Sequence, residues 1–138
     1  MIAIKKQDIV RLEDVLHLYQ AVGWTNYTNQ PQMLEQALSH SLVIYLALDG
    51  DAVVGLIRLV GDGFSSVFVQ DLIVLPSYQR QGIGSNLMKE ALGDFKDAYQ
   101  VQLVTDQKEK NLGFYRSLGF ETLSTYDCTG MIWMDRKR

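Results

Sequence analysis

The chain has 138 residues, of which 47% are hydrophobic and 21% charged, so it is long enough for one globular domain with a buried core. A formal net charge of -3 argues against the basic surface that nucleic-acid-binding domains usually carry. The single cysteine, Cys128, excludes an intramolecular disulfide and a cysteine-based metal site, which favours a reducing compartment.

The first part of the chain is expected to form a strand and then two helices. Residues 1–5 have the pattern of a short strand, and Asp8 is a candidate cap for a helix that Gly23 ends. A polar stretch over residues 25–30 leads to Pro31, a favoured first residue of a helix. This Pro31 helix should carry the apolar residues Leu34, Ala37 and Leu38.

Three strands are expected next, over residues 42–48, 52–60 and 67–75. The turn signals Asp49-Gly50-Asp51 and Asp62-Gly63 separate them. Strands joined by such short turns form an antiparallel meander.

The apolar spacing changes after Gly82 from that of a strand to that of a helix. A strand over residues 101–105 and a short helix over about 110–118 should follow, and the remainder, including residues 131–134, should form two closing strands. The expected fold class is α+β, with a mixed, mostly antiparallel sheet and helices on both faces. No linker or repeat interrupts it, so residues 1–138 are predicted to form one domain.

The turn between the third meander strand and the Gly82 helix has the features of an anion site. Gly82 and Gly84 remove side chains where a ligand approaches the backbone, and the first amides of a helix lack partners. The helix dipole and Arg80 add positive charge, which suits a pyrophosphate. The alternative is that the glycines only make a tight turn. Neither the P-loop nor the dinucleotide fingerprint is present.

Two segments together resemble the GCN5-related N-acetyltransferase (GNAT) superfamily. Residues 79–84 fit its pattern Gln/Arg-x-x-Gly-x-Gly/Ala, and residues 114–120 fit its pattern Phe-Tyr-x-x-x-Gly-Phe. Residues 74–76, Val-Leu-Pro, look like the strand end that precedes the first pattern. The resemblance implies the GNAT fold, with a splay between the fourth and fifth strands.

The resemblance also implies acetyl-CoA as co-substrate, with no metal. The pantetheine arm would pair with the strand backbone at Leu72, Ile73 and Val74, and the pyrophosphate would lie on the loop formed by Gln79, Arg80, Gln81, Gly82, Ile83, Gly84 and Ser85. Many relatives have an asparagine where this chain has Lys108. Asn111 is therefore the candidate for that pantetheine contact, with helix capping as the alternative.

Two residues are candidates for acid-base chemistry. Tyr115 lies where the family often has the general acid for the departing thiolate, and a phenol with a pKa of about 10 keeps its proton at neutral pH. The alternative for Tyr115 is a helical aromatic residue packed under the sheet. Asp71 is a candidate base for the amine, with a structural ion pair or hydrogen bond as the alternative. Strand alternation should send Gln70 and Asp71 to opposite faces.

Trp24 and Tyr27 follow the first helix, in a region that in this superfamily usually overhangs the acceptor site. They are candidates to bind the apolar body of the amine, although Trp24 alone also fits a core position. His17 and His40 are isolated and form no metal site.

The predicted function is direct transfer of an acetyl or short acyl group from acyl-CoA to a small-molecule or peptide amine. The alternative is a catalytically inactive acyl-CoA-binding module. The sequence predicts a cytoplasmic protein with neither nucleic acid nor membrane as partner, because its N-terminus meets charge before any long apolar run. The basic residues Arg136, Lys137 and Arg138 are expected to form a solvated tail, and a homodimer is compatible with these expectations.

Overall fold

The computed structural model describes residues 1–134, which divide into two compact units. The first unit is Met1–Val104, and the second begins at Thr105. The predicted basic tail of Arg136, Lys137 and Arg138 lies outside the described residues.

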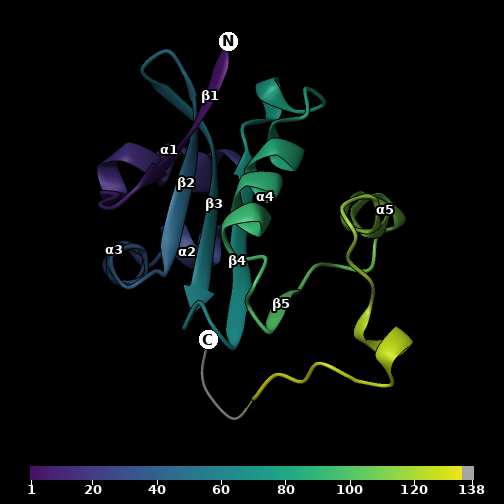
Figure 1. Ribbon diagram of the computed structural model, residues 1–138. Coiled ribbons are helices and arrows are strands. Elements are labelled where there is room, and N and C mark those ends of the chain that lie inside the picture. Colours follow the sequence, from purple (N-terminus) through teal and green to yellow (C-terminus); the bar gives the residue numbers. More distant parts are fainter. Residues whose placement is uncertain (135–138) are drawn as a thin grey trace. The chain divides into compact units, whose positions relative to one another are not determined.

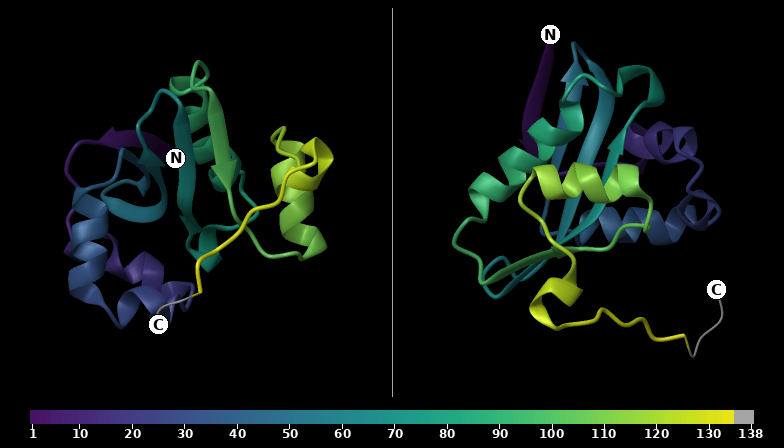
Figure 2. Two further views of the ribbon diagram at one scale, coloured as in Figure 1. Left: turned by 90° about the horizontal axis from the view of Figure 1, so that it is seen from below. Right: turned by 90° about the vertical axis from the view of Figure 1, so that its right-hand side faces the viewer.

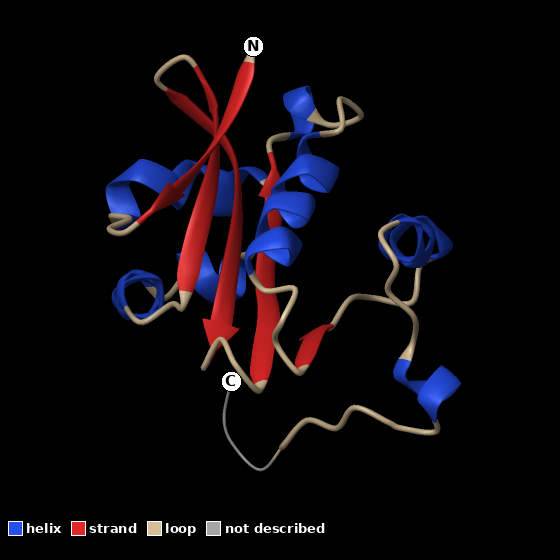
Figure 3. Cartoon of the chain, viewed as in Figure 1, coloured by secondary structure: helices blue, strands red, loops and turns tan. Residues whose placement is uncertain are grey.

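The first unit is built on a five-stranded sheet in the order β1-β2-β3-β4-β5 (Figures 1 and 3). Neighbouring strands from β1 to β4 are antiparallel, whereas β5 is parallel to β4. The predicted mixed, mostly antiparallel sheet is confirmed. The strands are β1 (Ile2–Gln7), β2 (Val43–Asp49), β3 (Ala52–Gly61), β4 (Ser66–Val74) and β5 (Gln100–Leu103).

Helices cover both faces of this sheet (Figure 2). One face carries α1 (Leu12–Ala21), α2 (Thr25–Thr28) and α3 (Pro31–Ser39), and the other carries α4 (Ile83–Asp94). Apolar residues at helical spacing form the contact of α1 with the sheet, because they lie on one side of the helix. These residues, Val15, Leu18 and Tyr19, are fully buried in one cluster with Leu34, Leu56 and Ile73.

The local signals in the sequence predict most of these elements. Pro31 is the first residue of α3, and α4 begins directly after Gly82, as expected. The cap assigned to Asp8 is wrong, because the chain remains outside the helix until Arg11, which is the N-cap of α1. The short helix α2 was not expected from the polar stretch that contains it.

The second unit contains α5 (Glu109–Ser117) and the short 3-10 helix η2 (Leu123–Tyr126). The two predicted closing strands are absent from the described part of this unit, so that prediction is wrong for residues 120–134. A strand needs a neighbour for its backbone hydrogen bonds, and the apolar pattern of residues 131–134 alone does not supply one. The side chains there are exposed, namely Met131, Ile132, Trp133 and Met134.

An ion pair crosses the interior of the first unit from β3 to β4. Arg58 and Asp71 are only 4% and 2% exposed, and Nε of Arg58 lies 2.7 Å from Oδ2 of Asp71. The two residues are also paired in the strand register. Each charge is therefore compensated inside the sheet rather than by water.

Replacing Arg58 with leucine should strongly destabilise the protein, because it leaves the Asp71 carboxylate buried without its cation. The free energy of unfolding, measured by urea denaturation, should fall by about 3–5 kcal/mol. Arg11→Leu is the control, since the Arg11–Glu13 pair is exposed, and its loss should be below about 1 kcal/mol. Equal losses in the two variants would contradict the importance of the buried pair.

Candidate functional site

The turn between β4 and α4 presents the N-terminus of a twelve-residue helix. Gly82 is the N-cap in a left-handed conformation, with φ of 79°. The first backbone bond of the helix runs from Asn86 N to Gly82 O, and no side chain among the described residues caps the helix. The amides of Ile83, Gly84 and Ser85 are thus available to an anion, and the helix dipole favours a negative charge there.

The space around this turn is open. A Cβ added at Gly82 would meet no atom within 4 Å, and Arg80 and Gln81 are exposed. Arg80 itself has a positive φ of 66°, an uncommon conformation for a residue with a side chain. Gln79 ties the turn back to the strand, because its Nε2 donates to the carbonyl of Val74 at 3.1 Å.

The strand that enters this turn has one edge without a neighbour. β4 pairs with β5 only from Ser66 to Val69, whereas its other edge stays paired with β3 as far as Val74. Beyond Val69 no described strand pairs with the β5 side of β4, which is the predicted splay. Leu72, Ile73 and Val74 therefore lie on a backbone edge that an extended ligand can pair with.

A β-bulge lies where the splay begins. The register pairs Leu59 with Val69 and Arg58 with Asp71, so Gln70 has no opposite residue on β3. Paired residues share a face, and successive residues of β3 face opposite sides. The bulge therefore places Val69 and Asp71 on opposite faces, although they are two residues apart.

The bulge also changes the expected relation between Gln70 and Asp71. Both side chains reach the same phenol, because Gln70 Nε2 donates to Tyr27 Oη at 3.4 Å and Tyr27 Oη donates to Asp71 Oδ1 at 2.9 Å. The expectation that strand alternation separates these two side chains is wrong at this position.

Asp71 is the centre of a buried hydrogen-bond cluster. Its Oδ2 accepts from Tyr19 Oη at 2.8 Å and from Arg58 Nε at 2.7 Å, while its Oδ1 accepts from Tyr27. Arg58 continues the cluster, because Nη2 donates to Tyr27 Oη at 3.2 Å and Nη1 donates to Ser41 Oγ at 3.2 Å. This geometry is the structural ion pair that the sequence left open for Asp71.

Burial and the Asp71 carboxylate set the protonation of this cluster. Burial, followed by the charge of Asp71, raises the pKa of Tyr19 and of Tyr27 above the ordinary tyrosine value of 10.0. Burial alone would lower the pKa of Arg58, but attraction to Asp71 outweighs it and the pKa is raised. Both phenols are neutral and the guanidinium is charged at neutral pH.

Trp24 and Tyr27 lie with Tyr19 in one aromatic group. Ring centroids are 5.1 Å apart for Tyr19 and Tyr27, 6.1 Å for Tyr19 and Trp24, and 6.2 Å for Trp24 and Tyr27. Trp24 and Tyr27 are half-buried and pack against the core of the first unit. The group offers aromatic surface beside the polar cluster.

The second unit carries Tyr115 and Asn111 on α5. Tyr115 is half-buried, and its ring meets the edges of Phe114 and Phe120. Burial, followed by the charge of Asp106, raises the pKa of Tyr115. Asn111 is not the N-cap; its Nδ2 donates to Asp106 Oδ1 at 2.8 Å.

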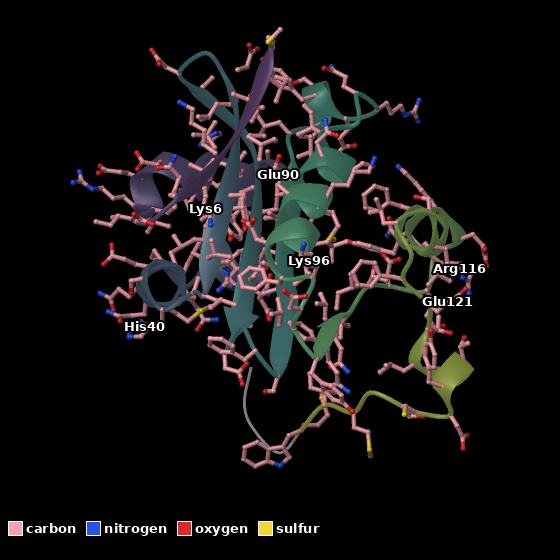
Figure 4. All side chains as sticks on the ribbon, viewed as in Figure 1. Lys6, His40, Glu90, Lys96, Arg116 and Glu121 are labelled. Carbon is pink, nitrogen blue, oxygen red and sulfur yellow. The ribbon has the colours of Figure 1, made fainter. Side chains whose placement is uncertain are left out.

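The end of α5 is held by an ion pair on the surface. Arg116 Nε lies 3.3 Å from Glu121 Oε1, which joins the helix to the chain that follows it (Figure 4). Both side chains are nearly half exposed, so this pair contributes little stability.

Comparison with models of known protein families shows which family the chain belongs to. A family model described as an acetyltransferase (GNAT) domain matches residues 40–122, which include the β4-α4 turn and the segment 114–120. The chain belongs to the GNAT acetyltransferase family. The resemblance inferred from the two sequence patterns is therefore confirmed.

Individual GNAT proteins agree with this assignment. A GNAT family acetyltransferase from Streptococcus pneumoniae TIGR4 is 84% identical, with a TM-score of 0.92 over 99% of this chain and 100% of the other. Serotonin N-acetyltransferase 2 of rice, Oryza sativa subsp. japonica, is 32% identical over 66% of this chain. The aligned region is about half of the rice protein, at 48% of its length.

A more distant GNAT structure shows the shared fold. An aminoglycoside N-acetyltransferase in complex with CoA is 18% identical, with a TM-score of 0.72 over 100% of this chain and 95% of the other.

Within residues 1–134, no helix is long and apolar enough to cross a membrane.

Two residues of the cluster were missed in the sequence. Arg58 is a charge inside the apolar segment 56–60 of β3, and a buried charge needs a partner, so its position was a usable signal. In the sequence Tyr19 could not be told from the apolar residues of α1, because its polar role depends on Asp71 on β4. Sequence spacing gave no sign of the bulge at Gln70.

The raised pKa values predict a late tyrosine titration. The unfolded chain ionises its tyrosines near pH 10, whereas folded Tyr19, Tyr27 and Tyr115 keep their protons. The stability they contribute is complete below that pH and is lost as the pH rises above it. Tyrosinate absorbance of the native protein should therefore lag behind that of the urea-unfolded protein, and coinciding curves would contradict the burial of these phenols.

Proposed function

We propose that this chain is an acyl-CoA-dependent N-acyltransferase, which moves an acetyl or short acyl group to an amine by direct transfer. The observation that carries the proposal is the continuity of the unpaired β4 edge with the open N-terminus of α4. A strand-like arm and an anionic group of one ligand can bind these two features in succession. Pantetheine and pyrophosphate occur in that order in CoA.

The residues present fit this co-substrate. Leu72, Ile73 and Val74 offer the backbone edge, and the amides from Ile83 to Ser85 offer uncapped donors beside the exposed Arg80. An aminoglycoside N-acetyltransferase of the same fold forms a complex with CoA, which supports CoA as the type of co-substrate. Gln79 contributes by holding the loop against the strand end, through its hydrogen bond to the carbonyl of Val74. The Asn111 contact to pantetheine is retained as a proposal, although its amide donates to Asp106.

The chemistry that acyl-CoA supplies is an activated thioester. In this proposal a backbone N–H of β4 beyond Val69 stabilises negative charge on the thioester oxygen. Tyr115 donates its phenolic proton to the departing sulfur, and its raised pKa keeps that proton in place at neutral pH. Trp24 and Tyr27 contact the acceptor.

The name of the rice relative makes arylalkylamines one class to test as acceptors. Purified protein with acetyl-CoA is offered serotonin, polyamines, amino acids and aminoglycosides, and release of free thiol is measured. At least one amine should give thiol release with a matching acetylated product. Binding of acetyl-CoA without thiol release from any amine would instead indicate the inactive binding module.

Gly82→Val tests the assignment of the CoA loop, and Gly50→Val is its control. The valine side chain would occupy open space in front of the helix amides, so affinity for acetyl-CoA in calorimetry should fall at least about tenfold. Gly50→Val is matched to it, because Gly50 has φ of 62° and also no atom within 4 Å of an added Cβ. Both variants carry a strain of about 1–2 kcal/mol. Unchanged affinity in folded Gly82→Val would show that the loop is assigned incorrectly.

Tyr115→Phe should separate catalysis from folding. The ring can keep its contacts with Phe114 and Phe120, and only the proton donor is removed. We expect normal acetyl-CoA affinity and a fall in kcat on the order of a hundredfold. Tyr126→Phe removes an exposed hydroxyl from the same unit and should leave kcat unchanged. If chemistry limits the rate and Tyr115→Phe also keeps its kcat, another group protonates the sulfur.

A further inference from the structure

The hydroxyl of Tyr27 is the outer end of the buried cluster around Asp71. Tyr27 is half-buried, and the exposed Gln70 contacts its hydroxyl from the bulge. Gln70 is also the first residue of β4 beyond the β4–β5 pairing. This hydroxyl therefore lies beside the start of the unpaired strand edge.

The hydrogen bonds of the cluster leave Tyr27 no proton to donate to a ligand. A phenol has one proton, and that proton is donated to Asp71 Oδ1. The guanidinium of Arg58 can only donate, so its contact with Tyr27 Oη uses the oxygen as an acceptor. Toward a ligand from solvent, Tyr27 Oη can therefore only accept a hydrogen bond.

The rest of the cluster holds this arrangement in place. Arg58 Nε and Tyr19 Oη both donate to Oδ2 of Asp71, which leaves Oδ1 for Tyr27. Charge-assisted bonds of 2.7 Å and 2.8 Å between buried groups are hard to rearrange. The groups that face Asp71 are thus Tyr19 from α1, Tyr27 from α2 and Arg58 from β3.

Gln70 indicates what kind of group the hydroxyl accepts. Its Nε2 is an N–H donor at 3.4 Å, which is long for a hydrogen bond, and the side chain is exposed. A nitrogen donor from outside the protein can displace it at little cost. An amine carries such a donor.

We propose that Tyr27 Oη accepts a hydrogen bond from the nitrogen of the acceptor amine and so directs the lone pair of that nitrogen toward the thioester. Asp71 and Arg58 are positioning residues that fix the phenolic proton. The inference rests on the proposed function. It differs from a role of Asp71 as base, because the carboxylate then receives no substrate proton.

The cluster orients the amine without changing its own protonation. As the N–C bond forms and the C–S bond breaks, the nitrogen releases its proton to water and the sulfur gains a proton. Tyr27 keeps its proton on the side of Asp71 throughout. The acceptor must therefore retain an N–H for Tyr27 while its lone pair attacks.

Tyr45→Phe is the control for Tyr27→Phe, because it also removes a phenolic hydrogen bond to a carboxylate, that of Asp94, which is not part of the Asp71 cluster. Steady-state kinetics use acetyl-CoA and the panel amine that releases thiol fastest. Tyr27→Phe should lower kcat/KM for the amine by about tenfold to a hundredfold and leave KM for acetyl-CoA unchanged. Tyr45→Phe should lower the urea midpoint but keep kcat/KM for the amine within about twofold. Equal kinetics in the two variants would overturn the inference.

Asp71→Asn tests the positioning role through the pH profile. It removes the charge and the basicity of the side chain but keeps its shape. The kcat/KM for the amine should fall, while its pH profile keeps the wild-type form. Loss of the acidic limb would make Asp71 the base and would overturn the inference. Absence of thiol release from the unmodified protein would remove the proposed function and this inference together.

Discussion

The Arg58–Asp71 pair is the constraint on which the first unit depends. Two buried charges must satisfy each other, and here they do so across neighbouring strands at 2.7 Å. The remaining donors and acceptors of the pair form hydrogen bonds with three further side chains. These are Tyr19 from α1, Tyr27 from α2 and Ser41 after α3. The ion pair thus has polar contacts with α1, with α2 and with the residue Ser41 that follows α3.

The Arg58–Asp71 pair also links the core of the first unit to the candidate binding site on β4. The strand that carries Asp71 is also the strand whose other edge is unpaired and whose end enters the α4 turn. Tyr19 on α1 and Tyr27 on α2 are both hydrogen-bonded to Asp71 on this strand, at 2.8 Å and 2.9 Å. The polar interior therefore supports both the core and the surface that faces a ligand.

Local chemistry made much of this architecture predictable. Pro31 and Gly82 mark helix starts by their own backbone preferences, and the Asp49-Gly50-Asp51 turn marks the β2–β3 hairpin. The two family patterns, in residues 79–84 and 114–120, predicted the GNAT relationship. The Gln70 bulge, the Tyr19 contact and the absence of strands in residues 120–134 could not be predicted, because each depends on partners distant in the sequence.

The bulge at Gln70 reverses the alternation of side chains between the two faces of β4. Val69 shares a face with Leu59, whereas Asp71 and Ile73 lie on the face of α1. An odd-numbered residue of β4 therefore faces the α4 side before the bulge and the α1 side after it. One extra residue thus exchanges the two faces of the strand, and it places the Asp71 carboxylate on the α1 side at the start of the unpaired edge.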